Sequence, residues 1–268
     1  NLKNFRQNPS FRRFQAGQSI VRGDHVSDAV TLKELLSTGA DAALAIGAPS
    51  RQALTHGALR DLVARTVATL NSFGVGRNDR VAIVLPNGPE MAACFLAVAS
   101  GTASAPLNPA YRGEEFEFYL GDLDAKLLIA MSGVDTPARA AAQKLGVPVA
   151  ELVPDLAAGA GSFTLQAPAG AVASAAANGG FAQPDDVAMV LHTSGTTSRP
   201  KIVPLSQKNL CASARNIRRT LAFSAQDRGL NIMPLFHIHG LIAGVLAPVS
   251  AGSEVFCSPG FDALKFFG

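Results

Sequence analysis

Residues 187–205 read Val187-Ala-Met-Val-Leu-His-Thr-Ser-Gly-Thr-Thr-Ser-Arg-Pro-Lys-Ile-Val-Pro-Leu205, a hydroxyl-rich segment between two apolar runs. The first run, Val187–Leu191, predicts a buried strand, so we expect the hydroxyl-rich segment to form a turn at that strand's end. Backbone N–H groups, hydroxyls and one lysine suit the acceptor oxygens of a polyphosphate. An ordinary Ser/Thr/Gly turn before a lysine is the alternative, and this segment alone does not decide between the two.

Outside this segment, the apolar pattern alternates between helix and strand. The spacing predicts helices after Thr55 up to Gly74 and over Glu90–Ser100, Gly113–Asp122, Pro137–Leu145, Gln207–Leu221 and Gly240–Val249. Short apolar runs predict strands at Arg80–Leu85, Lys126–Met131, Val147–Val153, Leu230–Met233 and Glu254–Cys257. This alternation predicts an α/β fold with mostly parallel sheets and flanking helices.

Composition divides the chain into four parts. Residues 1–30 form a basic leader, and residues 31–153 form a first α/β subdomain. Residues 154–184 are rich in Ala, Gly and Pro, which predicts a connector or surface excursion rather than a core element. Residues 185–268 form a second α/β segment that carries the hydroxyl-rich loop.

Charge and cysteine content narrow the function classes. Five of the 23 basic residues precede the first acid, Asp24, so 18 remain against 20 acids in the rest of the chain. A near-neutral body argues against nucleic acid as the main partner. The three cysteines form no C-x-x-C pair, which favours free thiols in a reducing compartment, and no run is apolar enough for a membrane span. We therefore expect a cytoplasmic protein.

Spacing excludes competing nucleotide and catalytic motifs. A Walker A loop fails because Gly195 is followed five residues later by Pro200, and Lys201 by Ile202. The chain contains neither G-x-G-x-x-G nor G-x-S-x-G. His237 and His239 stand two residues apart with no third ligand nearby, so we predict no metal held by protein side chains.

Several blocks resemble the adenylate-forming superfamily, the AMP-binding enzymes that include the acyl-CoA synthetases. Residues Thr193–Lys201 resemble its phosphate loop, and Met233–Gly240 resembles its second core motif. Residues 81–90, 106–109 and 114–122 resemble its N-terminal subdomain. The amino-acid sequence of the loop, together with Phe236-His-Ile-His-Gly240, is similar to that of oxalate–CoA ligase-like members.

The resemblance implies two-step chemistry, in which a carboxylate attacks the α-phosphate of Mg-ATP and coenzyme A then displaces AMP. Such chemistry leaves the protein mainly positioning and charge stabilisation to perform. By this resemblance, the loop binds the β- and γ-phosphates through Thr193, Ser194, Gly195, Thr196, Thr197, Ser198 and Lys201. Lys201 and His237 are its implied catalytic residues, His237 and His239 face the small carboxylic acid, and Mg²⁺ binds through the phosphates.

The chain departs from the superfamily pattern in two respects. Ile202 stands where the family usually has glycine, so either the backbone there is extended or the loop is strained. The sequence to Gly268 also contains no Tyr-Gly-x-Thr-Glu adenine loop, ribose-binding Asp, hinge or C-terminal domain with the catalytic lysine. We therefore expect an incomplete fold that binds ATP weakly at best and self-associates through the surfaces that this leaves exposed.

Three hypotheses from different classes follow. The chain is the N-terminal part of an ATP-dependent carboxylate–CoA ligase, inactive or only weakly nucleotide-binding by itself. Alternatively, it is a stand-alone module that binds a nucleotide or a carboxylate, or a truncated scaffold without catalysis. Pyrophosphate exchange separates the first hypothesis from the others, and loss of ATP binding in Lys201→Ala separates the second from the third.

Overall fold

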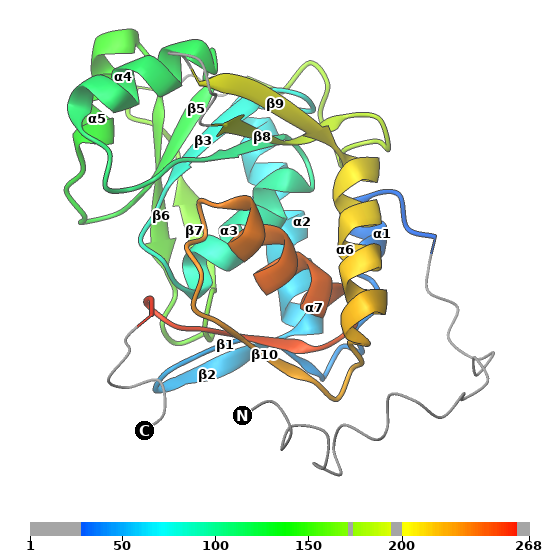
Figure 1. Ribbon diagram of the computed structural model, residues 1–268. Coiled ribbons are helices and arrows are strands. Elements are labelled where there is room, and N and C mark those ends of the chain that lie inside the picture. The colour runs from blue at the N-terminus through cyan, green and yellow to red at the C-terminus, as the bar shows by residue number, and fades with distance from the viewer. Residues whose placement is uncertain (1–27, 171–173, 194–199, 262–268) are drawn as a thin grey trace, which may run out of the picture.

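The computed structural model describes residues 28–170, 174–193 and 200–261, and these build two sheets with helices between and around them (Figure 1). The strands are β1 Leu44–Ala48, β2 Arg51–Thr55, β3 Arg80–Val84, β4 Ala103–Pro106, β5 Leu127–Met131, β6 Val149–Pro154, β7 Phe163–Gln166, β8 Val187–Thr193, β9 Lys201–Ser206, β10 Arg228–Asn231 and β11 Glu254–Cys257. The helices are α1 Leu32–Leu35, α2 His56–Ser72, α3 Pro89–Ala99, α4 Gly113–Asp122, α5 Pro137–Leu145, α6 Gln207–Leu221, η3 His239–Leu246 and α7 Ala247–Ser250.

The larger sheet has seven strands in the order β7-β6-β5-β3-β4-β8-β9. Its inner neighbours from β6 to β8 are parallel, whereas β7 and β9 join antiparallel at the two edges. The carboxyl ends of β3, β4 and β8 therefore lie at one edge of the sheet, where α/β proteins usually bind ligands. The predicted α/β class with mostly parallel sheets is confirmed.

The smaller sheet joins sequence-distant parts of the chain. Its order is β10-β11-β1-β2, with β1 parallel to β11 and Ile46 opposite Val255. The larger sheet likewise takes β8 and β9 from the segment after residue 185. Both sheets therefore draw strands from both of the α/β segments that composition distinguishes.

Helix α3 lies between the two sheets and is buried at every position. It contacts β4 of the larger sheet and β1 and β11 of the smaller one. Its single charged residue, Glu90, forms an ion pair with Arg51 of β2, and Arg51 Nη2 also donates to the Gly159 carbonyl at 2.8 Å. Because this pair is largely removed from water, loss of either partner would leave an unpaired charge in the interior. The contact also joins the smaller sheet to α3.

Helices α4 and α5 cover the opposite face of the larger sheet. Phe116 and Leu120 of α4 are fully buried against Ala82, Val84 and other sheet residues in a second apolar cluster. Helix α5 begins at a Thr136 cap followed by a proline and ends at Gly146, whose φ of 68° lies in the left-handed region. No helix in the described ranges is both long and apolar enough to cross a bilayer.

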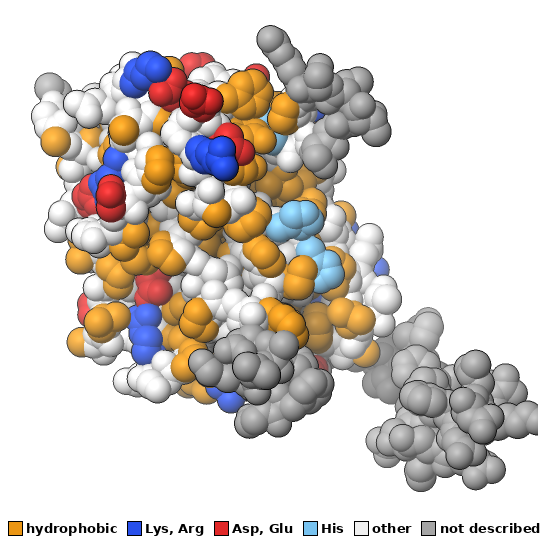
Figure 2. All heavy atoms as spheres, turned by 60° about the vertical axis from the view of Figure 1, so that its left-hand side comes forward, with side chains coloured by type: hydrophobic (Ala, Val, Ile, Leu, Met, Phe, Trp, Pro, Cys, Tyr) orange, Lys and Arg blue, Asp and Glu red, His pale blue; other side chains and the backbone are white. Residues whose placement is uncertain are grey.

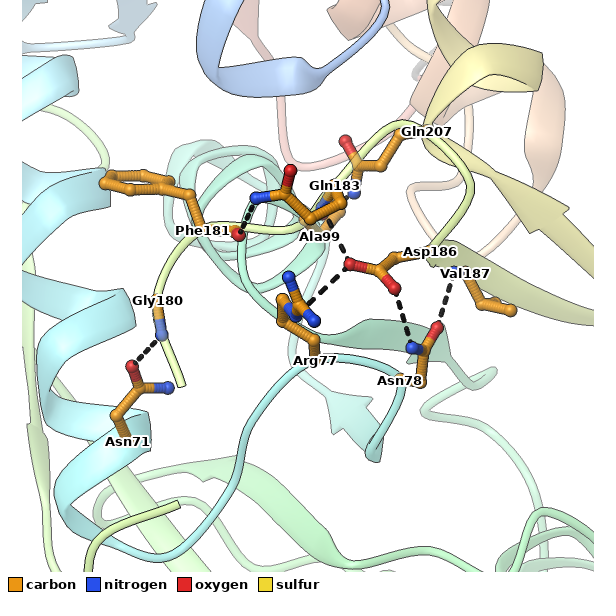
Figure 3. Close-up of polar contacts among 10 residues, drawn as sticks. All are labelled: Asn71, Arg77, Asn78, Ala99, Gly180, Phe181, Gln183, Asp186, Val187 and Gln207. Carbon is orange, nitrogen blue, oxygen red and sulfur yellow. Dashed lines mark hydrogen bonds and ion pairs between the residues drawn. The ribbon is translucent and has the colours of Figure 1, made fainter. Parts of the chain in front are cut away.

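The start of strand β8 is fixed by a polar network (Figure 3). Asn78 donates to Asp186 and accepts from the Val187 backbone N–H, both at 2.8 Å. Asp186 also accepts from the Gln183 N–H at 2.7 Å and lies 3.4 Å from the Arg77 guanidinium. These contacts hold β8 at the end that is far from the hydroxyl-rich loop.

Most predicted elements are present, with three corrections. Strand β7 lies inside residues 154–184, where we expected no core element, because Phe163 is buried and the strand pairs with β6. The strand predicted at Leu230–Met233 lies at Arg228–Asn231, in register with β11. The helix predicted over Gly240–Val249 is π-helical from His239 to Leu246, and α7 follows it directly.

Candidate functional site

Strands β8 and β9 bring the two described ends of the predicted phosphate loop together. Thr193 and Lys201 are direct partners in the antiparallel register. Strand β8 runs to Thr193, two residues beyond the predicted Val187–Leu191, and β9 returns from the same edge of the sheet. Ser194, Gly195, Thr196, Thr197 and Ser198 lie outside the described residues, so their predicted phosphate contacts stay predictions.

The Lys201 side chain is exposed at this edge. Among the described residues, no carboxylate forms an ion pair with it, whereas Lys208 pairs with Asp185 at 2.7 Å and Lys144 with Glu117 at 2.6 Å. An exposed ammonium without an acid partner is free to meet an anion. Thr193 opposite it is also exposed and carries a hydroxyl donor.

The backbone at Ile202 is extended, which is the first of the two alternatives that the sequence leaves open. It lies within β9 opposite His192, and its φ is not among the positive values of the described chain. Its side chain is half-buried and packs against the apolar cluster under α4. The isoleucine at the position of the family glycine therefore fits a regular strand without backbone strain.

His192, directly before the loop, makes contacts that sequence reasoning missed. Its Nε2 lies 2.9 Å from Asp122 Oδ2 at the end of α4, and the ring packs edge-on against Tyr119 at 4.7 Å. Tyr119 in turn stacks on Tyr111 with 4.8 Å between the ring centroids. The sequence shows only that a histidine precedes the loop, since its partner stands 70 residues away.

A cavity of about 530 Å³ opens among the segments that follow β3 and β4 of the larger sheet and β10 and β11 of the smaller one. The side chains around it are almost all apolar. They are Leu85, Asn87, Met91, Leu107, Pro109, Ile232, Met233, Pro234, Leu235, Phe236, Pro259, Gly260 and Phe261. Leu85 and Leu107 follow β3 and β4, so the cavity lies on the same edge of the larger sheet as Thr193 and Lys201.

Asn87 is the polar side chain that joins the cavity's walls. Its Oδ1 accepts from the Leu235 N–H at 2.8 Å, and its Nδ2 donates to the Ser258 carbonyl at 3.3 Å. One amide therefore connects the loop after β3 with the segments that follow β10 and β11. The sequence resemblance covers Asn87 but assigns it no role, because its partners are about 150 residues away or more.

The predicted substrate residues His237 and His239 follow the cavity wall directly. Both are exposed, and neither lines the cavity. Figure 2 shows histidine side chains at the surface beside hydrophobic ones. The segment that contains them turns tightly, because a Cβ on Gly240 would lie 2.3 Å from the Pro234 carbonyl oxygen. Their role toward a carboxylic acid stays a prediction.

The arrangement suits an extended anionic ligand beside an apolar surface. Thr193 and Lys201 supply a donor and a cation, and the cavity on the same edge is lined by apolar groups. Hydroxyl and ammonium donors match phosphate oxygens. Within the described part of the chain, no three His, Cys, Asp or Glu side chains gather to hold a metal ion.

Comparison with known proteins gives a family match over most of the chain. A family model described as an AMP-binding enzyme matches residues 36–267. A probable CoA ligase (CCL9) of Humulus lupulus and an oxalate–CoA ligase of Arabidopsis thaliana are each 44% identical, over 204 and 205 residues. Each alignment covers 75% of this chain but only 38% and 39% of the relative. The chain thus spans about two fifths of the length of these curated relatives.

Solved structures agree on the fold. Apo MatB from Rhodopseudomonas palustris superposes with a TM-score of 0.72 at 28% identity. The match covers 88% of this chain and 46% of that one. An ATP-bound crystal structure of MatB from the same organism superposes with a TM-score of 0.71 at 27% identity. Both matches again cover less than half of the longer chain.

Proposed function

The chain belongs to the AMP-binding enzyme family, and from that premise we propose that it forms the triphosphate-binding part of an ATP-dependent carboxylate–CoA ligase. In the proposed reaction, an acid and ATP give an acyl adenylate and pyrophosphate, and the thiol of coenzyme A then attacks the acyl carbonyl, which forms the thioester and releases AMP. The chain spans about two fifths of the length of its curated relatives. The activity, the acid substrate and the use of coenzyme A are therefore proposed for it.

One observation carries the proposal. Thr193 and Lys201 lie opposite each other at the carboxyl edge of the parallel strands, and Lys201 has no carboxylate partner among the described residues. A paired donor and cation at this position supports binding of the terminal phosphates. Lys201 would reduce the repulsion between phosphate oxygens as charge moves during adenylate formation.

The acid is proposed to lie on the side of the cavity. His237 and His239 directly follow the wall residues Met233–Phe236, and this adjacency supports assigning the two histidines to the carboxylate. Asn87 keeps this wall in place through its bond to Leu235. The three cysteines are free and buried, which supports a cytoplasmic location for the reaction.

The test is titration of the chain with Mg-ATP. We expect weak binding that shifts the backbone amide signals of Thr193 and Lys201. Lys201→Ala should weaken binding about tenfold or more, the effect of removing one charge-assisted contact. Lys208→Ala is the matched control, because it removes an exposed lysine that already pairs with Asp185, and it should bind like the wild type.

Two outcomes argue against the proposal. Amide signals of Thr193 and Lys201 that stay unmoved at millimolar Mg-ATP would show that the hairpin does not meet the nucleotide. Equal weakening by Lys201→Ala and Lys208→Ala would show general attraction of an anion to the surface.

A further inference from the structure

We propose that His192 is a positioning residue for this site: its hydrogen bond to Asp122 fixes the end of β8 and thereby places Thr193 and Lys201. The inference rests on the proposed function only for the ligand that these two residues meet. The structural step, from α4 through His192 to the strand end, concerns the chain alone. Nothing in the sequence resemblance gives His192 or Asp122 a role.

The geometry around His192 is specific. Its side chain is 6% exposed, and its Nε2 lies 2.9 Å from Asp122 Oδ2. An ionised carboxylate only accepts, so Nε2 donates and the bond fixes which ring nitrogen carries the proton. The Tyr119 ring meets the imidazole edge-on at 69°, which limits its rotation. A buried ring with one directed bond and one aromatic wall holds a single orientation.

That orientation is passed to the site through the β8–β9 ladder. His192 is the partner of Ile202, and the next pair is Thr193 with Lys201. Ile202 packs on the same apolar cluster as Tyr119 and Tyr111. His192 on β8 bonds to α4, and Ile202 on β9 packs on the apolar cluster beneath it, each one residue away from the proposed phosphate contacts. A shift of His192 moves the backbone of Thr193 directly.

The other end of β8 is held independently. The Asn78 contacts to Asp186 and Val187 lie at the strand's start (Figure 3). Met189 and Val190 are buried in the middle of the strand. Loss of the His192 bond should therefore loosen the loop end of the hairpin and leave the strand in the sheet. This separates positioning from general folding.

The experiment compares four variants in Mg-ATP binding and thermal unfolding. His192→Ala removes the bond, and we expect affinity to fall about tenfold, the scale of one hydrogen bond, while the unfolding midpoint changes by only a few degrees. His192→Gln retains an N–H donor that reaches Asp122, so it should keep affinity within about threefold. Asp122→Asn keeps an acceptor oxygen and should also retain most of the affinity.

The matched control is Glu117→Gln on the same helix. Glu117 and Asp122 have similar side-chain exposure, 35% and 39%, but Glu117 pairs with Lys144 rather than with β8. It should leave Mg-ATP affinity unchanged. If His192→Ala and Glu117→Gln weaken binding equally, or if His192→Gln falls as far as His192→Ala, the inference is wrong.

Hydrogen exchange without nucleotide provides the second readout. We expect His192→Ala to speed amide exchange in residues 191–193 and 201–203 and to leave residues 187–189 unchanged. If Lys201→Ala abolishes binding while His192→Ala alters neither affinity nor exchange, the proposed function stands and the positioning role is overturned. If the wild type binds no Mg-ATP, the proposed function fails, and selective exchange at the loop end still supports the structural step.

Discussion

Gly240 lies where the chain turns from β10 into η3, and its missing side chain is a structural requirement. A Cβ there would lie 2.3 Å from the Pro234 carbonyl oxygen, a backbone atom that cannot rotate away. We expect Gly240→Ala to lower the free energy of unfolding by about 2 kcal/mol, as overpacking does. Urea denaturation measures this directly.

Gly121→Ala is the control for that substitution. Nothing lies within 4 Å of a Cβ on Gly121, which is in the last turn of α4. Alanine there should raise stability by up to about 1 kcal/mol, because glycine is the poorer helix former. Equal stability of the two variants would contradict the close approach at Gly240.

Buried His56 at the start of α2 gives the molecule a pH-dependent stability. Its side chain is 1% exposed, and burial lowers its pKa from the ordinary 6.5. The unfolded chain therefore binds this proton at a higher pH than the folded one does. The contribution of His56 to the free energy of unfolding is fully present well above pH 6.5. It is lost as the pH falls through 6.5, by at most about 1.4 kcal/mol per pH unit.

The measurement is urea denaturation of wild type and His56→Gln between pH 8 and pH 5. We expect the variant to be less stable at pH 8 but to lose less stability on acidification. Hydrogen bonds lower the pKa of Glu151, through Arg139, and of Asp227, through the Ser224 N–H. The ordinary pKa values of these two carboxyls, 4.5 and 3.8, already lie below this window, and the hydrogen bonds lower them further. Parallel curves for both proteins would exclude His56 as the cause.

At the scale of elements, three secondary-structure elements each bury one thiol. Cys94 of α3, Cys211 of α6 and Cys257 of β11 are free and buried. Burial raises all three pKa values, to about 12 for Cys211 and Cys257. At pH 8 the thiolate fraction of such a group is about a thousandfold below that of an ordinary thiol.

We therefore expect the native chain to react very slowly with a disulfide reagent at pH 8, and all three thiols to react once it is unfolded in urea. The absorbance of the released thiol counts them. Rapid reaction of one thiol in the native chain would show that its element opens locally.

Local patterns predict some elements well and others not at all. The sequence locates α4, α5 and α6 with their observed bounds, because the apolar spacing along a helix is a local feature. Strands β1 and β2 were not predicted, since Leu44–Ala48 and Arg51–Thr55 contain few β-branched residues. They become strands through pairing and burial, which no local window contains.

The candidate site follows the same division. The positions of Thr193 and Lys201 at a strand's end can be predicted from the apolar runs that flank them. The contacts of His192 with Asp122 and of Asn87 with Leu235 depend on how α4 and the loop after β10 pack, 70 and 148 residues away. Sequence periodicity does not specify such long-range packing.

For the whole molecule, strand β10 predicts self-association. Within the described residues, it pairs with β11 on one side only, and Leu230 on it is 55% exposed. An open edge with an exposed leucine favours pairing with a second chain. We expect a dimer or larger species by light scattering at tens of micromolar, and a shift toward monomer in Leu230→Lys.

Leu156→Lys is the control for that shift. Leu156 is more exposed, at 72%, but lies outside the strands. It should leave the distribution of species unchanged. A wild-type monomer throughout this concentration range would contradict the prediction.

The smaller sheet has a consequence for how the chain is made. Strand β1 is synthesised about two hundred residues before β11, the partner that Ile46 meets at Val255. At usual translation rates, that interval lasts roughly 10–40 s. During that time the edge of β1 that later pairs with β11 has no hydrogen-bond partner, and the apolar face of the strand is exposed. Nascent chains should therefore depend on chaperones until Cys257 has left the exit tunnel.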